Sequence, residues 1–188
     1  QVAIEGVVLL KNKDNFFPLN TTQKLTIAVI GENAVKSMTT GGGSSELKAN
    51  YEISPLEGIK KRFKNASIIF SKGYTSEDTN QSRKSLINEA LVTASMADVV
   101  LFFGGLNKNR GQDCEAADRE ELKLPYNQDY LIAELQKVNP NIGVVLVSGN
   151  AVSMPWIYDV KTVFQAWYLG SEAGNAIADI ISGDSNPS

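Results

Sequence analysis

Short apolar runs alternate along the chain with segments of helical periodicity. Five of these runs are apolar almost throughout, a pattern typical of strands that are covered on both faces of a parallel sheet. They lie at residues 25–30, 67–71, 98–103, 142–147 and 161–166. The pattern therefore predicts a mostly parallel sheet.

Four segments between or after these runs predict helices. The first, from residue 54 to about residue 63, begins with Ser54, Pro55 and Glu57, which supply an N-cap, a proline at the first helical position and a capping-box glutamate. The other three lie at residues 82–96, 127–138 and 172–181. The N-terminal stretch from Val2 to Lys11 is also apolar and helix-like. Strands alternating with helices imply right-handed crossovers and a three-layer α/β sandwich.

Ligands of such sheets bind to the loops that follow the carboxyl ends of strands. Two of these loops, at residues 31–53 and 104–126, are far longer than the roughly 2–6 residues that are usual for a strand-to-helix connection. Ligand-binding or catalytic residues are therefore expected in these two loops.

The loop at residues 31–53 contains three glycines followed by two serines: Gly41, Gly42, Gly43, Ser44 and Ser45. Glycines let the backbone approach a partner closely, and serines supply hydroxyl groups. A phosphate-binding loop is an alternative, but no Lys-Ser or Lys-Thr pair follows the glycines and no Gly-x-Gly-x-x-Gly fingerprint opens a helix after the first run, so the loop is neither a P-loop nor a dinucleotide-binding turn. A flexible surface loop is an equal alternative on composition alone.

The loop at residues 104–126 carries five carboxylates within residues 113–121. A solvated acidic loop is the simplest interpretation. A catalytic role would need one carboxyl group that stays protonated near neutral pH, and Glu115 is the candidate, because its two small neighbours allow another surface to close over it. Asp118 and Arg119 predict an ion pair or a clasp within the loop. Cys114 is expected to be a small packed residue.

Composition narrows the classes of function. The 188 residues suit a single domain, and a net charge of −3 argues against nucleic-acid binding. The chain has no histidine, which excludes a Ser-His-Asp triad and a His-ligated zinc site within it, and its single cysteine excludes an internal disulfide. No metal or cofactor is expected. No apolar run approaches the roughly 20 residues of a membrane-spanning helix, so no membrane partner is expected either.

A series of short motifs resembles the second domain of glycoside hydrolase family 3 enzymes. In chain order the motifs are residues 7–12, 17–19, 27–34, 41–45 and 54–59, Glu115-x-x-Asp118-Arg119, Leu124-Pro125 with Gln128, and residues 154–156, 165–168 and 172–176. They are collinear and cover essentially the whole chain. Where the more usual family motif has glycine and an aromatic residue between the glutamate and the aspartate, this sequence has Ala116 and Ala117.

The resemblance implies an (α/β)6-sandwich domain that follows a (β/α)8-type barrel, in retaining, exo-acting β-glycosidases such as β-glucosidases and β-xylosidases. It assigns the acid/base role to Glu115, with Asp118 and Arg119 in support, and leaves the nucleophilic aspartate to the barrel. We expect residues 1–188 to be one domain of such an enzyme, inactive alone, with the barrel and a β-linked oligosaccharide or glycoside as partners. The residues expected to line or support the sugar cleft are Gly42, Gly43, Ser44 and Ser45. A periplasmic or secreted location is suggested by relatives only.

Two alternatives stay open at this point. The domain could bind sugar or support a neighbouring domain, with the acid supplied elsewhere. It could also be a nucleotide- or flavin-binding α/β module, although the fingerprints of that class are missing from the sequence.

Overall fold

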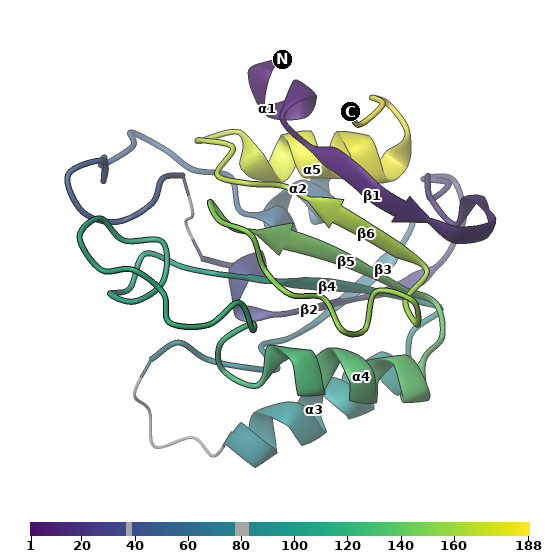
Figure 1. Ribbon diagram of the computed structural model, residues 1–188. Coiled ribbons are helices and arrows are strands. Elements are labelled where there is room, and N and C mark those ends of the chain that lie inside the picture. Colours follow the sequence, from purple (N-terminus) through teal and green to yellow (C-terminus); the bar gives the residue numbers. More distant parts are fainter. Residues whose placement is uncertain (37–38, 78–82) are drawn as a thin grey trace.

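The computed structural model describes residues 1–36, 39–77 and 83–188. It contains a six-stranded sheet in the order β1-β6-β5-β4-β2-β3 (Figure 1). The strands are β1 (Val8–Asn12), β2 (Thr26–Ile30), β3 (Ser67–Ser71), β4 (Val99–Gly105), β5 (Ile142–Val147) and β6 (Thr162–Gln165). Strands β2 to β6 are parallel to one another, whereas β1 pairs antiparallel with β6 at one edge. The predicted mostly parallel sheet is confirmed.

Helices cover both faces of the sheet (Figure 1). The helical segments are α1 (Val2–Glu5), α2 (Pro55–Arg62), α3 (Arg83–Ser95), α4 (Gln128–Val138) and α5 (Ala173–Ser182), with short 3-10 turns η1 (Lys13–Asn15) and η2 (Glu32–Ala34). Helices α1, α2 and α5 lie on one face and enclose one apolar core, and α3 and α4 enclose a second core on the other. Because the apolar strands are buried on both sides, the three-layer α/β sandwich is confirmed.

The helices lie close to their predicted positions. At the start of α2 the Ser54 hydroxyl accepts a hydrogen bond from the Glu57 N–H at 3.3 Å, and the Ser54 N–H donates to the Glu57 carboxylate at 2.8 Å. This is the capping box that the sequence predicts. Residue 82, the first of the predicted helix at 82–96, lies outside the described residues, and α3 begins at Arg83.

The N-terminal segment differs from the prediction. Helix α1 ends at Glu5, and Val8–Asn12 forms β1 instead of continuing the helix to Lys11. An apolar run without clear periodicity suits a strand as well as a helix, and here the backbone of β6 supplies its hydrogen-bonding partners. The Ser188 N–H also donates to the Val7 carbonyl, so the two termini lie side by side (Figure 1).

Candidate functional site

The parallel strands end at one edge of the sheet, and the two long loops meet there (Figure 1). Gly42 forms an isolated parallel bridge with Cys114. In this bridge the Gly42 N–H donates to the Asp113 carbonyl at 2.8 Å, and the Glu115 N–H donates to the Gly42 carbonyl at 3.1 Å. The loop at residues 31–53 therefore lies directly against the backbone that carries Glu115.

Two glycines make this contact possible. A Cβ at Gly42 would lie 2.4 Å from the Lys108 carbonyl oxygen. A Cβ at Gly43, whose φ is +91°, would lie 2.5 Å from the Glu115 Cβ. Both distances are far inside van der Waals contact, so the glycine-rich segment is needed for close backbone approach between the loops.

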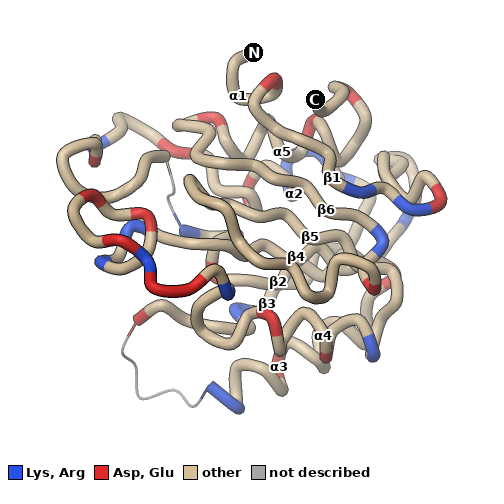
Figure 2. Tube along the Cα trace, viewed as in Figure 1, with Lys and Arg blue, Asp and Glu red and all other residues tan. Residues whose placement is uncertain are grey.

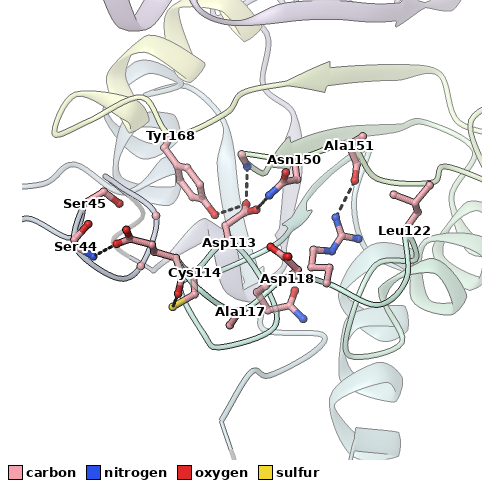
Figure 3. Close-up of a pocket in the computed structure, with 16 residues that line it drawn as sticks. Ser44, Ser45, Asp113, Cys114, Ala117, Asp118, Leu122, Asn150, Ala151 and Tyr168 are labelled. Carbon is pink, nitrogen blue, oxygen red and sulfur yellow. Dashed lines mark hydrogen bonds between the residues drawn. The ribbon is translucent and has the colours of Figure 1, made fainter.

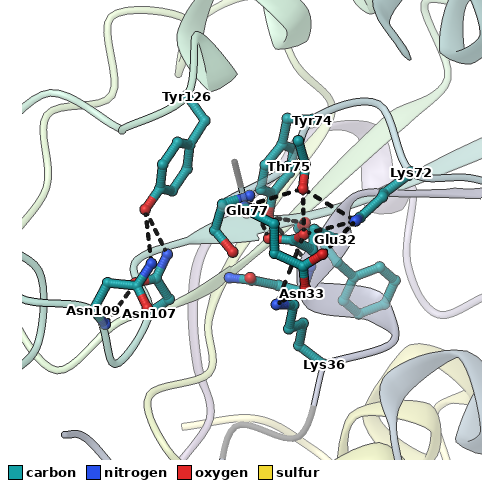
Figure 4. Close-up of polar contacts among 12 residues, drawn as sticks. Glu32, Asn33, Lys36, Lys72, Tyr74, Thr75, Glu77, Asn107, Asn109 and Tyr126 are labelled. Carbon is teal, nitrogen blue, oxygen red and sulfur yellow. Dashed lines mark hydrogen bonds and ion pairs between the residues drawn. The ribbon is translucent and has the colours of Figure 1, made fainter. Parts of the chain in front are cut away.

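A buried carboxylate anchors the beginning of the first loop (Figure 4). Glu32, only 1% exposed, lies 3.0 Å from the Lys72 ammonium and accepts hydrogen bonds from the Thr75 hydroxyl at 2.9 Å and the Ser76 N–H at 2.8 Å. Burial by itself would raise the pKa of Glu32, but hydrogen bonds from Ser76, Lys72 and Thr75 outweigh it, and the pKa is lowered. The carboxylate therefore ties the start of this loop to the segment after β3.

Tyr126 brings the two ends of the second loop together. Its hydroxyl oxygen accepts hydrogen bonds from the Asn107 side chain at 3.0 Å and the Asn109 side chain at 3.4 Å, as Figure 4 shows. Its ring stacks on Tyr74, with the ring centroids 6.3 Å apart. The acidic residues between these ends, coloured red in Figure 2, thus lie on a loop closed at its base.

The two loops and two shorter ones enclose an open hollow of about 700 Å³ (Figure 3). The second loop contributes Glu115, Asp118 and Arg119, and the segments after β5 and β6 contribute Asn150 and Tyr168. The first loop contributes Gly42, Ser44 and Ser45. Gly43 instead lines a neighbouring hollow, together with residues 46–49. The structure therefore brings all the predicted site residues except Gly43 to one hollow.

Glu115 is exposed at this hollow, and its carboxylate accepts a hydrogen bond from the Ser44 N–H at 2.8 Å. Hydrogen bonding to Ser44 holds the pKa of Glu115 below its ordinary value. The small neighbour Ala116 is itself exposed, and among the described residues none covers the Glu115 side chain, so the surface that could close over it would have to come from another domain. Glu115 is therefore an ionised, accessible carboxylate in the chain alone.

Arg119 forms the clasp, one of the two predicted alternatives. Its guanidinium donates to the carbonyls of Ala151 and Glu121, both at 2.8 Å, and to that of Lys123 at 3.3 Å. Among the ion pairs of the described residues, none joins Asp118 to Arg119. Arg119 therefore holds the loop through backbone carbonyls, and the Asp118 side chain lines the hollow.

Asp113, which is not among the predicted site residues, is the one buried carboxylate of the acidic run. It is 8% exposed and accepts hydrogen bonds from the Gly149 N–H at 2.6 Å, the Asn150 side chain at 2.5 Å and the Tyr168 hydroxyl at 2.6 Å (Figure 3). Burial, together with the hydrogen bond to Asp113, raises the pKa of Tyr168. No pattern in the run distinguishes Asp113 from its exposed neighbours, because the three donors to its carboxylate all lie more than 30 residues away along the chain.

In the described part of the chain, no group of three or more His, Cys, Asp or Glu side chains is placed to hold a metal ion. Within residues 1–36, 39–77 and 83–188, no helix has both the length and the apolarity to span a membrane. The chemistry that this arrangement offers is proton exchange, with Glu115 accessible to any group that covers the hollow.

Comparison with known proteins agrees with this picture. The model of the Glycosyl hydrolase family 3 C-terminal domain matches residues 7–188. Over its whole length the chain is 43% identical to beta-glucosidase BoGH3A of Bacteroides ovatus and 38% identical to an exo-alpha-(1->6)-L-arabinopyranosidase of Bifidobacterium longum. It is also similar to the crystal structure of a GH3 beta-glucosidase of Bifidobacterium adolescentis, with a TM-score of 0.85 and 37% identity over 97% of this chain. The chain covers 27%, 25% and 26% of these three proteins, about a quarter of each.

Proposed function

The chain belongs to the glycosyl hydrolase family 3 C-terminal domain family, and from that membership we propose that it supplies the acid/base group of a retaining, exo-acting β-glycosidase. Glu115 is the proposed acid/base residue, and terminal β-linked glycosides of the glucoside or xyloside type are the proposed substrates. Because the chain spans about a quarter of its relatives, we further propose that residues 1–188 are one domain of a larger enzyme. A barrel domain outside them would carry the nucleophilic aspartate.

Retaining hydrolysis uses two carboxyl groups about 5–5.5 Å apart. In the first step a carboxylate attacks the anomeric carbon while protonated Glu115 gives its proton to the glycosidic oxygen, so that the C–O bond breaks and a neutral alcohol leaves. In the second step ionised Glu115 takes a proton from water, and the water oxygen displaces the enzyme carboxylate. Glu115 ends protonated and one water is consumed. Because both carboxyl groups are needed, the chain alone is expected to be inactive.

One observation supports this role above the others. The Glu115 carboxylate is exposed at the rim of an open hollow, whereas the Glu115 backbone is fixed by its hydrogen bond to Gly42. An acid that works between two domains needs this combination of reach and fixed position. A covering domain would remove water and bring a second carboxylate close, and both changes raise the pKa of a glutamate.

Replacing Glu115 with alanine in the complete enzyme tests the proposal. General acid/base assistance contributes about 10²–10⁴-fold in rate, so Glu115→Ala should lower kcat/KM on an unactivated disaccharide by that factor. A dinitrophenyl glycoside, whose leaving group needs no proton, should keep most of its glycosylation rate. Azide should restore turnover of the dinitrophenyl glycoside and give a glycosyl azide product, because in the second step the small anion attacks the glycosyl-enzyme without needing a base.

Glu120→Ala is the matched control, because Glu120 is an exposed carboxylate of the same acidic run that does not line the hollow. It should leave both substrates unaffected. Glu115 is not the acid/base group if Glu115→Ala keeps the wild-type kcat/KM on the disaccharide, or if kcat/KM falls by the same factor on both substrates.

A support role is the second candidate, and the lowered pKa of Glu115 in this chain favours it, because an acid catalyst must carry a proton. In that case the domain would bind sugar or brace the barrel, and the acid would come from elsewhere. Glu115→Gln would then change affinity or stability and leave the pH profile of turnover in place. Under the acid/base proposal the same substitution removes the alkaline limb of that profile.

A further inference from the structure

Asp113 is a buried carboxylate whose partners come from two other segments at the carboxyl edge of the sheet. Gly149 and Asn150 follow β5, and Tyr168 follows β6. Hydrogen bonds to a carboxylate are shorter and stronger than those between neutral groups, and the three distances of 2.5–2.6 Å fit that class. Asp113 therefore fixes its own loop against the ends of two neighbouring strands.

The main chain of the same residue is fixed as well. The Asp113 N–H donates to the Asn107 carbonyl at 2.9 Å, and its carbonyl accepts from the Gly42 N–H at 2.8 Å. Two residues further on, the Glu115 N–H donates to the Gly42 carbonyl. The position of the Glu115 backbone thus depends on the short segment that Asp113 anchors.

We propose that Asp113 is a positioning residue that sets where Glu115 points its carboxyl group. This inference rests on the proposed acid/base role of Glu115. An asparagine at position 113 would present an amide N–H₂ in place of one acceptor oxygen, so one of the three donors would face a donor in a buried site. Such an unpaired buried group is costly, and a movement of the loop that relieves it would carry Glu115 with it.

The test compares Asp113→Asn with Asp129→Asn in the complete enzyme. Asp129 is the matched control, because its carboxylate also accepts from a backbone N–H, that of Leu124 at 3.2 Å, and from an aromatic side chain, that of Trp156 at 2.7 Å. It lies outside the hollow. Both variants are measured for thermal stability, for kcat and KM on a disaccharide and a dinitrophenyl glycoside, and for azide rescue.

Misplacement of a reacting group by about 1 Å can cost on the order of 10²-fold. We therefore expect Asp113→Asn to lower kcat/KM, which reports the glycosylation step, by about 10- to 100-fold on the disaccharide and by less than about 3-fold on the dinitrophenyl glycoside. Because Glu115 is also the proposed base of the second step, kcat on the dinitrophenyl glycoside should fall, and azide should raise it again. Asp129→Asn should lack this selectivity between leaving groups, whatever its effect on stability. The proposal is overturned if Asp113→Asn loses the same factor in kcat/KM on both substrates, or if Asp129→Asn shows the same selectivity.

Tyr168→Phe covers the case in which Asp113→Asn does not fold. It removes one of the three donors and leaves the Asp113 carboxylate in place, so it should show the same selectivity between leaving groups at a smaller size. If Tyr168→Phe shows no selectivity between leaving groups, the result contradicts the proposal. Glu115→Ala, measured alongside, separates the two inferences. If it lacks the selectivity, the acid/base role itself fails, and if it alone shows the selectivity, only the positioning role of Asp113 fails.

Discussion

Ala116 adopts a left-handed backbone conformation, with a φ of +59°, directly after Glu115. Residues with a Cβ are strained in this region, and glycine is not. The more usual motif that the sequence resembles has glycine at this position. The structure gives the physical reason for that preference, because the loop turns left-handed immediately after the glutamate.

Replacing Ala116 with glycine should therefore stabilise the folded chain. Ala116 is exposed, so little packing is lost, and we expect a net gain of about 0.5–1 kcal/mol in the free energy of unfolding after the entropy of glycine is subtracted. Urea denaturation measures it. Ala117→Gly is the control, because Ala117 has no positive φ and should lose up to about 1 kcal/mol. Equal effects of the two substitutions would contradict this explanation.

The acidic run shows where prediction of the site from sequence ends. Parallel topology requires the two long loops to share one edge of the sheet, so their meeting could be predicted. The burial of Asp113 could not, because its surroundings are built from residues after β5 and β6. The bridge between Gly42 and Cys114 could not be predicted either, since a backbone contact between two loops leaves no periodic pattern in the sequence.

At the scale of elements, the sequence predicts the buried strands well because they are apolar on both faces. Two departures have a common cause. Strand β4 continues through Gly105, where the Gln128 side chain accepts from the Gly105 N–H and donates to its carbonyl, both at 2.8 Å. Strand β1 exists because β6 pairs with it. In both cases a partner that is distant in sequence supplies backbone hydrogen bonds, which local propensity cannot reveal.

The cap of α2 is a local feature and therefore gives a prediction at this scale. Ser54→Ala removes the side-chain acceptor for the Glu57 N–H and should lower the free energy of unfolding by about 1 kcal/mol. Ser85→Ala, an exposed change inside α3, should have an effect within about 0.5 kcal/mol. Thermal or urea denaturation of the two variants compares them, and the interpretation fails if both are equally stable.

At the scale of the whole molecule, the ionisation of Glu115 depends on what covers it. In the chain alone, hydrogen bonding to Ser44 lowers its pKa. A lowered pKa in the folded state means that this contact contributes fully above the pKa of the unfolded chain, about 4.3 for glutamate. Its contribution is lost as the pH falls through the folded pKa. The contact thus favours folding at neutral pH and weakens in acid.

An NMR titration of the Glu115 carboxyl carbon checks this prediction. In the folded chain the midpoint should lie below that of the same carbon in the urea-unfolded chain. If Glu115 is the acid/base group, as proposed, the alkaline limb of kcat/KM in the complete enzyme should report a higher pKa for the same group, because only its protonated form would then be active. A folded chain that titrates at or above the unfolded reference would contradict the assigned contact with Ser44.

The backbone bridge between Gly42 and Cys114 also has a consequence for engineering. If one loop alone were replaced by that of a relative to alter the pocket, it would lose the backbone hydrogen bonds to its natural partner loop. Residues 31–53 and 104–126 should therefore be exchanged together, because replacing 104–126 alone would separate two loops whose backbones fit each other.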